Sequence, residues 1–184
     1  MVTIDTVEEA DIAGLAQLEA CCFPKEEAAD EAALRRRAKA FPESFLVMKK
    51  DGVIIGMING CVSNQQVICD AMYEDESLHD PYGAYQTVFG LDVHPAHQHQ
   101  GYAGELMQAL IETAKKERRT GMVLTCKKHL IGFYEQFGYR NMGVSASVHG
   151  GANGMICCCA LRDTDRTGIM ELLTAAGSAA VITT

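Results

Sequence analysis

The segment that most constrains the fold runs over residues 91–107 and reads LDVHPAHQHQGYAGELM. Its start has the apolar character of a strand end, and its last residues open a helix with a periodic apolar stripe. Between them, Gln98, Gly101 and Ala103 have the spacing Q-x-x-G-x-A. A strand, a glycine-containing loop and a helix N-terminus in this order place unpaired backbone N–H groups and the positive end of the helix dipole at one point. The segment therefore predicts an anion site that suits a pyrophosphate.

Hydrophobic patterning predicts the elements on either side of this junction. Runs rich in apolar and β-branched residues predict strands over residues 2–7, 45–49, 53–62, 85–93, 121–126, 139–145 and 155–161. Apolar stripes at helical spacing predict helices over residues 8–21, 26–40, 101–117 and 127–137. Asp51-Gly52 is typical of a type I′ turn that joins two antiparallel strands. The order β-α-α-β-β-β-α-β-α-β-β predicts an α/β fold of the α+β kind with a mixed sheet.

Two segments of this pattern have special features. Gly90 lies inside the predicted strand 85–93, where a glycine allows a bulge or a close approach of another backbone. The acidic stretch over residues 70–80 is predicted to be a surface loop. It either keeps the protein soluble or lines the mouth of a site that attracts a cationic amine.

The length of 184 residues suits one domain, and the net charge of −8 restricts its partners. Proteins that bind nucleic acid regardless of sequence need a basic surface, so we expect no such partner. The basic run over residues 35–37 is expected to be a solvated helix face. No stretch approaches the roughly 18 apolar residues of a membrane helix, and the N-terminus lacks a basic segment followed by an apolar run. We therefore expect a cytoplasmic protein, monomeric or homodimeric, without a membrane partner.

The cysteines and histidines suggest metal binding at first sight. Five of the eight cysteines are adjacent to another cysteine, and none forms a CxxC pair, so buried reduced thiols are expected. His94, His97 and His99 form the pattern HxxHxH within the predicted anion loop, without a carboxylate or thiol at useful spacing. We therefore predict no metal site.

Several motifs resemble those of one enzyme superfamily. The strand end LDVHP, the loop QHQGYA and the downstream FYEQFGY resemble motifs A and B of the GNAT acetyltransferases. CFPKEEAA, FPESFLV, LTCKKHLIGFYEQFGYRNMGVS and HGGA are similar to arylalkylamine N-acetyltransferases of the non-vertebrate kind. The resemblance covers residues 1–161 and implies a GNAT domain of that extent. Residues 162–184 form a C-terminal extension in which IMELLTAA is expected to be a weak helix.

The resemblance implies acetyl-coenzyme A as cosubstrate and assigns residues to it. Leu91, Asp92 and Val93 pair through their backbone with the pantetheine arm, and the strand splays near residues 90–92, which leaves an N–H for the thioester oxygen. The pyrophosphate is bound by Gln98, His99, Gln100, Gly101, Tyr102, Ala103 and Gly104. Tyr134 in FYEQFG matches the tyrosine that lies beside the coenzyme sulfur and donates a proton to the leaving thiolate.

The general base is not assigned by the resemblance. Vertebrate arylalkylamine acetyltransferases have two histidines on the strand before the coenzyme loop, and Thr87 and Phe89 stand at the matching positions. The sequence offers as candidate bases Asp70, Glu74, His79 and Asp92. We expect direct acetyl transfer to the primary amine of a small molecule, of the arylalkylamine or polyamine type. The alternatives are a protein N-terminal or lysine acetyltransferase and a catalytically inactive module that binds coenzyme A.

Overall fold

The structure, a computed structural model, describes residues 1–145 and 154–161. Its strands are β1 (Val2–Thr6), β2 (Phe45–Lys50), β3 (Val53–Asn59), β4 (Val62–Ser63), β5 (Tyr85–Val88), β6 (Gly90–Val93), β7 (Gly121–Cys126), β8 (Arg140–Val144) and β9 (Met155–Ala160). Its α-helices are α1 (Ile12–Cys22), α2 (Glu31–Ala40), α3 (Ala71–Glu74), α4 (Tyr102–Lys116) and α5 (Ile131–Glu135). Its 3-10 turns are η1 (Glu9–Asp11), η2 (Pro42–Ser44), η3 (Glu76–Leu78), η4 (Pro95–His97) and η5 (Lys128–Leu130).

The strands form two sheets that part at one point. The first sheet has the order β1-β2-β3-β6, and the second has the order β4-β5-β7-β9-β8. Pairing is antiparallel throughout except between β5 and β7, which confirms the mixed character expected from the sequence. β5 and β6 follow each other in the chain but belong to different sheets, so the prediction of one strand over residues 85–93 is wrong at Phe89.

The interruption at Phe89 between β5 and β6 is one of two breaks in predicted strands, and the second lies opposite it. The predicted strand over residues 53–62 ends at Asn59 and resumes as β4 in the other sheet. At the two breaks the Phe89 N–H donates to the Asn59 carbonyl over 2.8 Å, and the Thr87 N–H donates to the Cys61 carbonyl over 2.9 Å. A Cβ added to Gly60 would lie 2.0 Å from the Thr87 carbonyl oxygen, so only glycine allows the backbones to approach this closely. The two breaks are therefore in direct backbone contact, where the chain passes from one sheet to the other.

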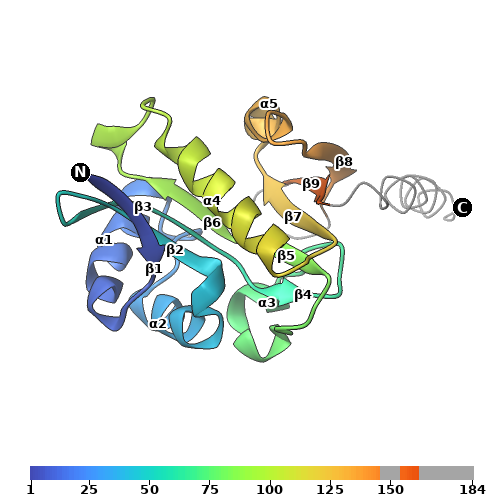
Figure 1. The fold of residues 1–184 in the computed structure, drawn as a ribbon, viewed down its shortest axis with the longest axis horizontal. Coiled ribbons are helices and arrows are strands. Elements are labelled where there is room, and N and C mark those ends of the chain that lie inside the picture. The colour runs from blue at the N-terminus through green and yellow to red at the C-terminus, as the bar shows by residue number, and fades with distance from the viewer. Residues whose placement is uncertain (146–153, 162–184) are drawn as a thin grey trace, which may run out of the picture.

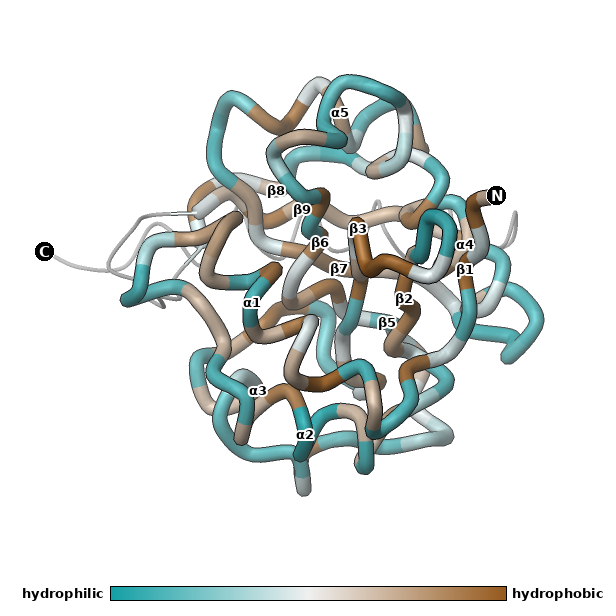
Figure 2. Tube along the Cα trace, turned by 90° about the vertical axis from the view of Figure 1, so that its left-hand side faces the viewer, coloured by the Kyte–Doolittle hydropathy of each residue, from teal (hydrophilic) through white to brown (hydrophobic). Residues whose placement is uncertain are grey.

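Helices cover both faces of the first sheet (Figure 1). α4 packs on one face against β2, β3 and β6, while α1 packs on the other face against β3 and β6 and is itself covered by α2. Leu106, Leu110 and Ile111 of α4 belong to the larger apolar core, and Ile12 and Leu15 of α1 belong to a second one. The most hydrophobic segments gather in the central strands, and hydrophilic segments lie at the periphery (Figure 2). Within the described part of the chain, no helix is long and apolar enough to cross a membrane.

Local capping and burial correct three of the sequence predictions. The helix predicted over residues 26–40 begins only at Glu31, because the Asp30 side chain caps it by accepting from the Ala33 N–H at 2.7 Å. The stretch over residues 70–80 forms α3 and η3, and it buries Met72. Arg35 and Arg36 are exposed as expected, but Arg37 is only 5% exposed.

Other local predictions are confirmed. Asp51 and Gly52 both have positive φ, 51° and 83°, as a type I′ turn requires. All eight cysteines are unbridged thiols as expected, but only four are buried, namely Cys61, Cys126, Cys157 and Cys159. The helix expected in IMELLTAA lies outside the described residues.

Candidate active site

The loop between β6 and α4 presents backbone amides to solvent. His99 and Gly101 have left-handed φ angles of 60° and 89°, and Gly101 caps the start of α4. The first intrahelical bond runs from the Glu105 N–H to the Gly101 carbonyl over 3.1 Å, so the amides of residues 102–104 have no carbonyl acceptor within the helix. The side-chain amide of Gln98 holds the loop against β6, because its Nε2 donates to the Val93 carbonyl over 3.0 Å. The backbone amides of residues 102–104, called the amide cradle below, are available to an anion, and the binding of a pyrophosphate there stays a prediction of the Q-x-x-G-x-A spacing.

The edge of β6 that faces away from β3 is open for hydrogen bonding. β6 pairs with β3 in the register Met57 to Asp92, and the His94 N–H continues the ladder by donating to the Ile55 carbonyl over 2.8 Å. Alternate residues of an antiparallel strand point their backbone groups in opposite directions, so those of Leu91 and Val93 point away from β3, where the Val93 carbonyl already accepts from the Gln98 side chain. An extended amide-containing chain can pair there as an additional strand would.

A cavity of about 840 Å³ connects this loop with the point where the sheets part. Of the residues predicted to bind coenzyme, its walls include Leu91, Val93, Gln98, His99, Gly101, Tyr102, Ala103 and Gly104. Tyr134 also lines the cavity. Asp92 and Gln100 do not line it, and the Asp92 side chain is buried beneath it instead. One continuous space therefore brings together the predicted coenzyme site and the predicted proton donor.

Tyr134 is held in the cavity wall by α5. Its side chain is 8% exposed, and its ring packs on Phe133 and Tyr139 at centroid distances of 5.1 and 5.8 Å. Burial is the main factor that raises the pKa of Tyr134, and the nearby Cys126 and Cys157 add to the effect. The phenol therefore stays protonated at neutral pH, as a proton donor must.

The cavity wall also contains four residues that were not predicted as site residues, and together they are called the far end of the cavity below. Glu19 of α1, Arg37 of α2, Tyr73 of α3 and Phe89 at the sheet break all line it. The Phe89 ring packs on Tyr73 at a centroid distance of 4.8 Å, and the Arg37 guanidinium lies 5.2 Å from the centre of the same ring. Glu19 continues the buried stripe of α1, four residues after Leu15. A carboxylate within an apolar stripe was the sequence signal for this site.

The charged groups at this end have altered proton affinities. Burial raises the pKa of Glu19 to about 7, although a hydrogen bond from the Ala29 N–H and the charge of Arg37 both oppose the shift. Burial likewise lowers the pKa of Arg37, against the attraction of Glu19 and Glu76. Burial also raises the pKa of Asp92 well above its ordinary value, and the charge of Glu19 adds to this. A carboxyl group with a pKa near neutrality in a cavity is a candidate for acid–base chemistry.

The raised pKa of Glu19 makes stability depend on pH. The folded state binds this proton more tightly than the unfolded chain, whose carboxyl has the ordinary pKa of 4.5. Its stabilising contribution is complete below pH 4.5 and is lost as the pH rises through about 7. We expect the free energy of unfolding to fall by about 3 kcal/mol from this group between the two limits. Urea unfolding of the wild type and of Glu19→Gln between pH 4 and 8 measures this dependence. The free energy of unfolding of the variant should not fall with pH by the amount assigned to Glu19.

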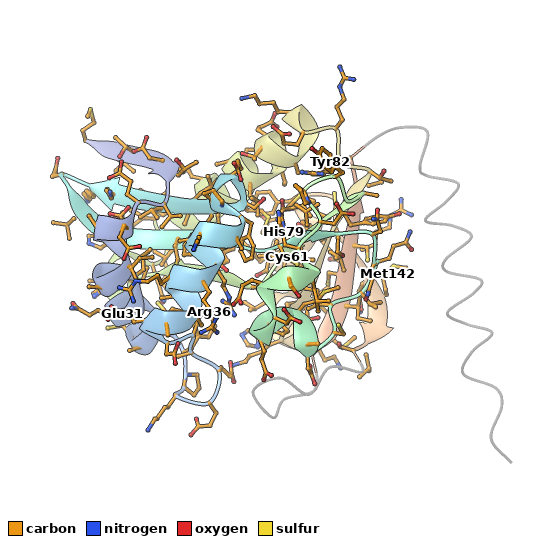
Figure 3. All side chains as sticks on the ribbon, turned by 90° about the horizontal axis from the view of Figure 1, so that it is seen from below. Glu31, Arg36, Cys61, His79, Tyr82 and Met142 are labelled. Atoms are coloured by element: carbon orange, nitrogen blue, oxygen red, sulfur yellow. The ribbon has the colours of Figure 1, made fainter. Side chains whose placement is uncertain are left out.

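Three of the candidate bases lie elsewhere. Asp70, Glu74 and His79 do not line the cavity. The His79 ring accepts a hydrogen bond from the Val62 N–H at 3.1 Å and packs on Phe41 at 5.4 Å. Figure 3 shows His79 beside Cys61, the residue that precedes Val62. His79 is therefore a structural residue of the second sheet.

The HxxHxH pattern does not assemble a cluster of ligands. The His94 ring accepts from the Ala96 N–H at 3.2 Å, and its centroid lies 6.0 Å from that of His97. Among the residues that the structure describes, no group of three histidine, cysteine or acidic side chains is arranged to hold a metal ion.

Gly101→Ala is expected to weaken coenzyme binding and to destabilise the fold by a comparable, modest amount. A Cβ at this position meets no atom within 4 Å, so the cost to folding is the left-handed backbone alone, about 1 to 2 kcal/mol. A methyl group on the amide cradle should raise the Kd for coenzyme A by about tenfold, equivalent to the loss of one hydrogen bond to a charged group. Calorimetric titration and thermal unfolding of the same sample measure the two effects. Unchanged affinity would place the pyrophosphate elsewhere.

Comparison with known proteins identifies the family. The sequence profile described as the acetyltransferase (GNAT) family matches residues 12–139. No curated protein sequence matches the chain. Similar solved structures include the GphF GNAT-like decarboxylase in complex with isobutyryl-CoA, 23% identical over 87% of this chain and 100% of that chain, with a TM-score of 0.76.

Two further structures share the fold. The loading GNATL domain of CurA from Lyngbya majuscula is 13% identical over 88% of this chain and 98% of that chain, with a TM-score of 0.77. Arabidopsis thaliana Naa50, in complex with the bisubstrate analogue CoA-Ac-MVNAL, is 15% identical over 86% of this chain and 98% of that chain, with a TM-score of 0.67. The profile match spans more than half of the chain, and the amide cradle and open strand edge agree with it. The chain belongs to the acetyltransferase (GNAT) family and is an acyltransferase that uses coenzyme A thioesters.

Proposed function

We propose that the chain transfers acetyl from acetyl-CoA directly to the primary amine of a small molecule, of the arylalkylamine type. The observation that carries this proposal is the continuity of the cavity. It runs from the amide cradle, past Tyr134, to an end that combines carboxylates with aromatic rings. A thioester bound along β6 and an amine bound at that end would meet where the sheets part.

The chemistry of the far end favours an aromatic amine over a purely aliphatic polyamine. Phe23, Tyr73 and Phe89 offer ring surfaces to an aryl group, and Glu19 and Glu27 offer carboxylates to an ammonium group. Glu27 is paired with Lys127 at 3.1 Å, which leaves Glu19 as the carboxylate free of an ion pair within 4 Å among the described residues. One ring site and one acidic site match a ligand with one ring and one amine. The resemblance of CFPKEEAA and HGGA to arylalkylamine acetyltransferases supports the same class.

The proposed coenzyme contacts follow from the backbone. The amides of Tyr102, Ala103 and Gly104 would bind the pyrophosphate, and the open edge at Leu91 and Val93 would pair with the pantetheine arm. Each hydrogen bond to a charged group contributes about 1.5 to 3 kcal/mol, so a few amides suffice to anchor the diphosphate. This leaves the thioester beside Tyr134, whose hydroxyl would donate a proton to the departing sulfur.

Thiol release from acetyl-CoA in the presence of single amines tests the function. Tyramine, tryptamine, spermidine and a short peptide with a free N-terminus represent the competing acceptor classes. We expect turnover that depends on the amine and is fastest with the two arylalkylamines, with the N-acetyl product identified by mass spectrometry. Turnover of the peptide alone would assign a protein N-terminal acetyltransferase. Coenzyme binding without turnover of any amine would assign an inactive module.

A further inference from the structure

Three polar side chains from three elements converge on Gly90, the first residue of β6. A Cβ added to Gly90 would lie 3.6 Å from Glu19 Oε1, 3.6 Å from Asp92 Oδ1 and 3.6 Å from Asn59 Nδ2. They come from α1, β6 and β3, and α1 packs against both strands (Figure 1). Gly90 follows the break at which the sheets part. The convergence therefore lies where the thioester and the amine are proposed to meet.

Within this cluster, Glu19 is the group that reaches the cavity. All three side chains are buried, with Glu19 only 3% exposed, but Glu19 lines the cavity and Asp92 and Asn59 do not. Both carboxylate oxygens of Asp92 and both polar side-chain atoms of Asn59 have no hydrogen-bond partner among the described residues. Burial without a hydrogen-bond partner disfavours the ionised form of Asp92, and its pKa is raised well above the ordinary value. Glu19 is the carboxyl of this cluster that lines the cavity, where it can exchange a proton with a bound ligand.

The charged and titratable groups around Glu19 act on it from each neighbouring element. Arg37 on α2 attracts its charge, Asp92 on β6 is a carboxyl whose pKa is raised by burial and by Glu19, and Cys22 on α1 is a thiol whose pKa burial raises to about 12. Tyr73 on α3 has a pKa raised to about 12 by burial. Burial raises the pKa values of Asp92, Cys22 and Tyr73, so it favours their uncharged forms. Burial, the hydrogen bond from the Ala29 N–H and the charge of Arg37 therefore set the proton affinity of Glu19.

We propose that Glu19 is the general base of the acetyl transfer, and this inference rests on the function proposed above. Oε1 of Glu19 takes one proton from the bound ammonium, and the freed lone pair attacks the thioester carbonyl carbon. The new N–C bond forms, the C–S bond breaks, and the thiolate takes the proton of the Tyr134 hydroxyl. The second proton lost from nitrogen restores Tyr134, and Glu19 releases its proton to solvent.

The pH profile of kcat/KM tests the assignment in the wild-type protein. With tyramine, we expect kcat/KM to fall about tenfold per pH unit below the pKa of Glu19, about 7. O-Benzylhydroxylamine is unprotonated at neutral pH and needs no base, so its profile should be flat over the same range. The fall of kcat/KM below the pKa is called the acidic limb of the profile. If the limb persists with this probe, the proposal is overturned, because the limb then belongs to another group.

Glu19→Gln is the matching variant. It keeps an oxygen to accept from the Ala29 N–H, the bond that spans 3.3 Å to Oε2 in the wild type, but it cannot take a proton. We expect kcat with tyramine to fall about 100-fold, the limb to disappear, and the loss to be much smaller with O-benzylhydroxylamine. Calorimetric Kd values for coenzyme A should be unchanged. Equal losses with both acceptors, or a retained limb, would overturn the proposal.

Glu27→Gln separates the two cavity carboxylates. Glu27 is paired with Lys127 at the cavity wall, so its loss should raise the KM for tyramine and leave the limb in place. Loss of the limb in Glu27→Gln, with the limb retained in Glu19→Gln, would assign the base to Glu27 and overturn the proposal. A kcat with tyramine that Glu19→Gln leaves undiminished contradicts this inference alone. Absence of turnover with every amine contradicts the proposed function and this inference together.

Discussion

Tyr134→Phe is expected to lower kcat about 100-fold and to leave the Kd for coenzyme A nearly unchanged, because it removes the proton donor and retains the ring. The ring packs on Phe133 and Tyr139, and these contacts do not involve the hydroxyl. The hydroxyl lies in the cavity wall, where the raised pKa keeps it protonated. Steady-state kinetics with a saturating amine and calorimetry with coenzyme A measure the two quantities on one preparation.

Tyr82→Phe is the matched control. Tyr82 is 93% exposed and does not line the cavity, and Figure 3 shows it at the outer side of the molecule. The same chemical change there should alter neither kcat nor Kd. If Tyr134→Phe lowers coenzyme affinity and kcat by the same factor, the residue supports the site and does not donate the proton.

Gly60→Ala is expected to cost on the order of 4 kcal/mol of unfolding free energy, because the new methyl group would meet backbone. The added Cβ would lie 2.0 Å from the Thr87 carbonyl oxygen and 2.6 Å from its carbonyl carbon. Neither atom can rotate away, and the Thr87 N–H is held by the Cys61 carbonyl at 2.9 Å. Relief therefore requires the two breaks to separate. Urea unfolding monitored by circular dichroism measures the loss.

Gly132→Ala provides the comparison within the same chain. Gly132 lies in α5, and a Cβ there meets nothing within 4 Å. Alanine has the higher helix propensity, so this substitution should be neutral or stabilise the protein by up to about 1 kcal/mol. A cost at Gly60 no larger than that at Gly132 would show that the sheets do not depend on close approach at the break.

Local patterns predicted the element types well and their boundaries less well. The start of α4 at Tyr102 and the turn at Asp51-Gly52 depend on a few neighbouring residues, and both are as expected. In the apolar run over residues 85–93, Gly90 allows a bulge but does not require a change of sheet, because both β5 and β6 need the same residue types. Only their pairing with different strands divides them at Phe89. The split of the sheet was therefore implied by the family resemblance and not by the pattern.

The acceptor end of the cavity shows the limit of sequence reasoning most clearly. Arg37 belongs to a run of three arginines that reads as a solvated face, and it is buried because α2 packs on α1 and η3. Glu19 lies in the apolar stripe of α1, so its spacing in the sequence predicts that it is buried. The spacing does not predict which groups surround the carboxylate. The candidates taken from the acidic stretch lie outside the cavity instead.

The amino-acid sequence alone determined the backbone of the loop proposed to bind coenzyme, since the left-handed turn at Gly101 and the unpaired amides after it follow from backbone rules that act over a few residues. Tertiary structure alone decided the proposed acid–base end of the cavity, where Glu19 from α1 and Asp92 from β6 meet beside Gly90. Burial and charge proximity set proton affinity, and both depend on segments that lie more than 70 residues apart in the chain.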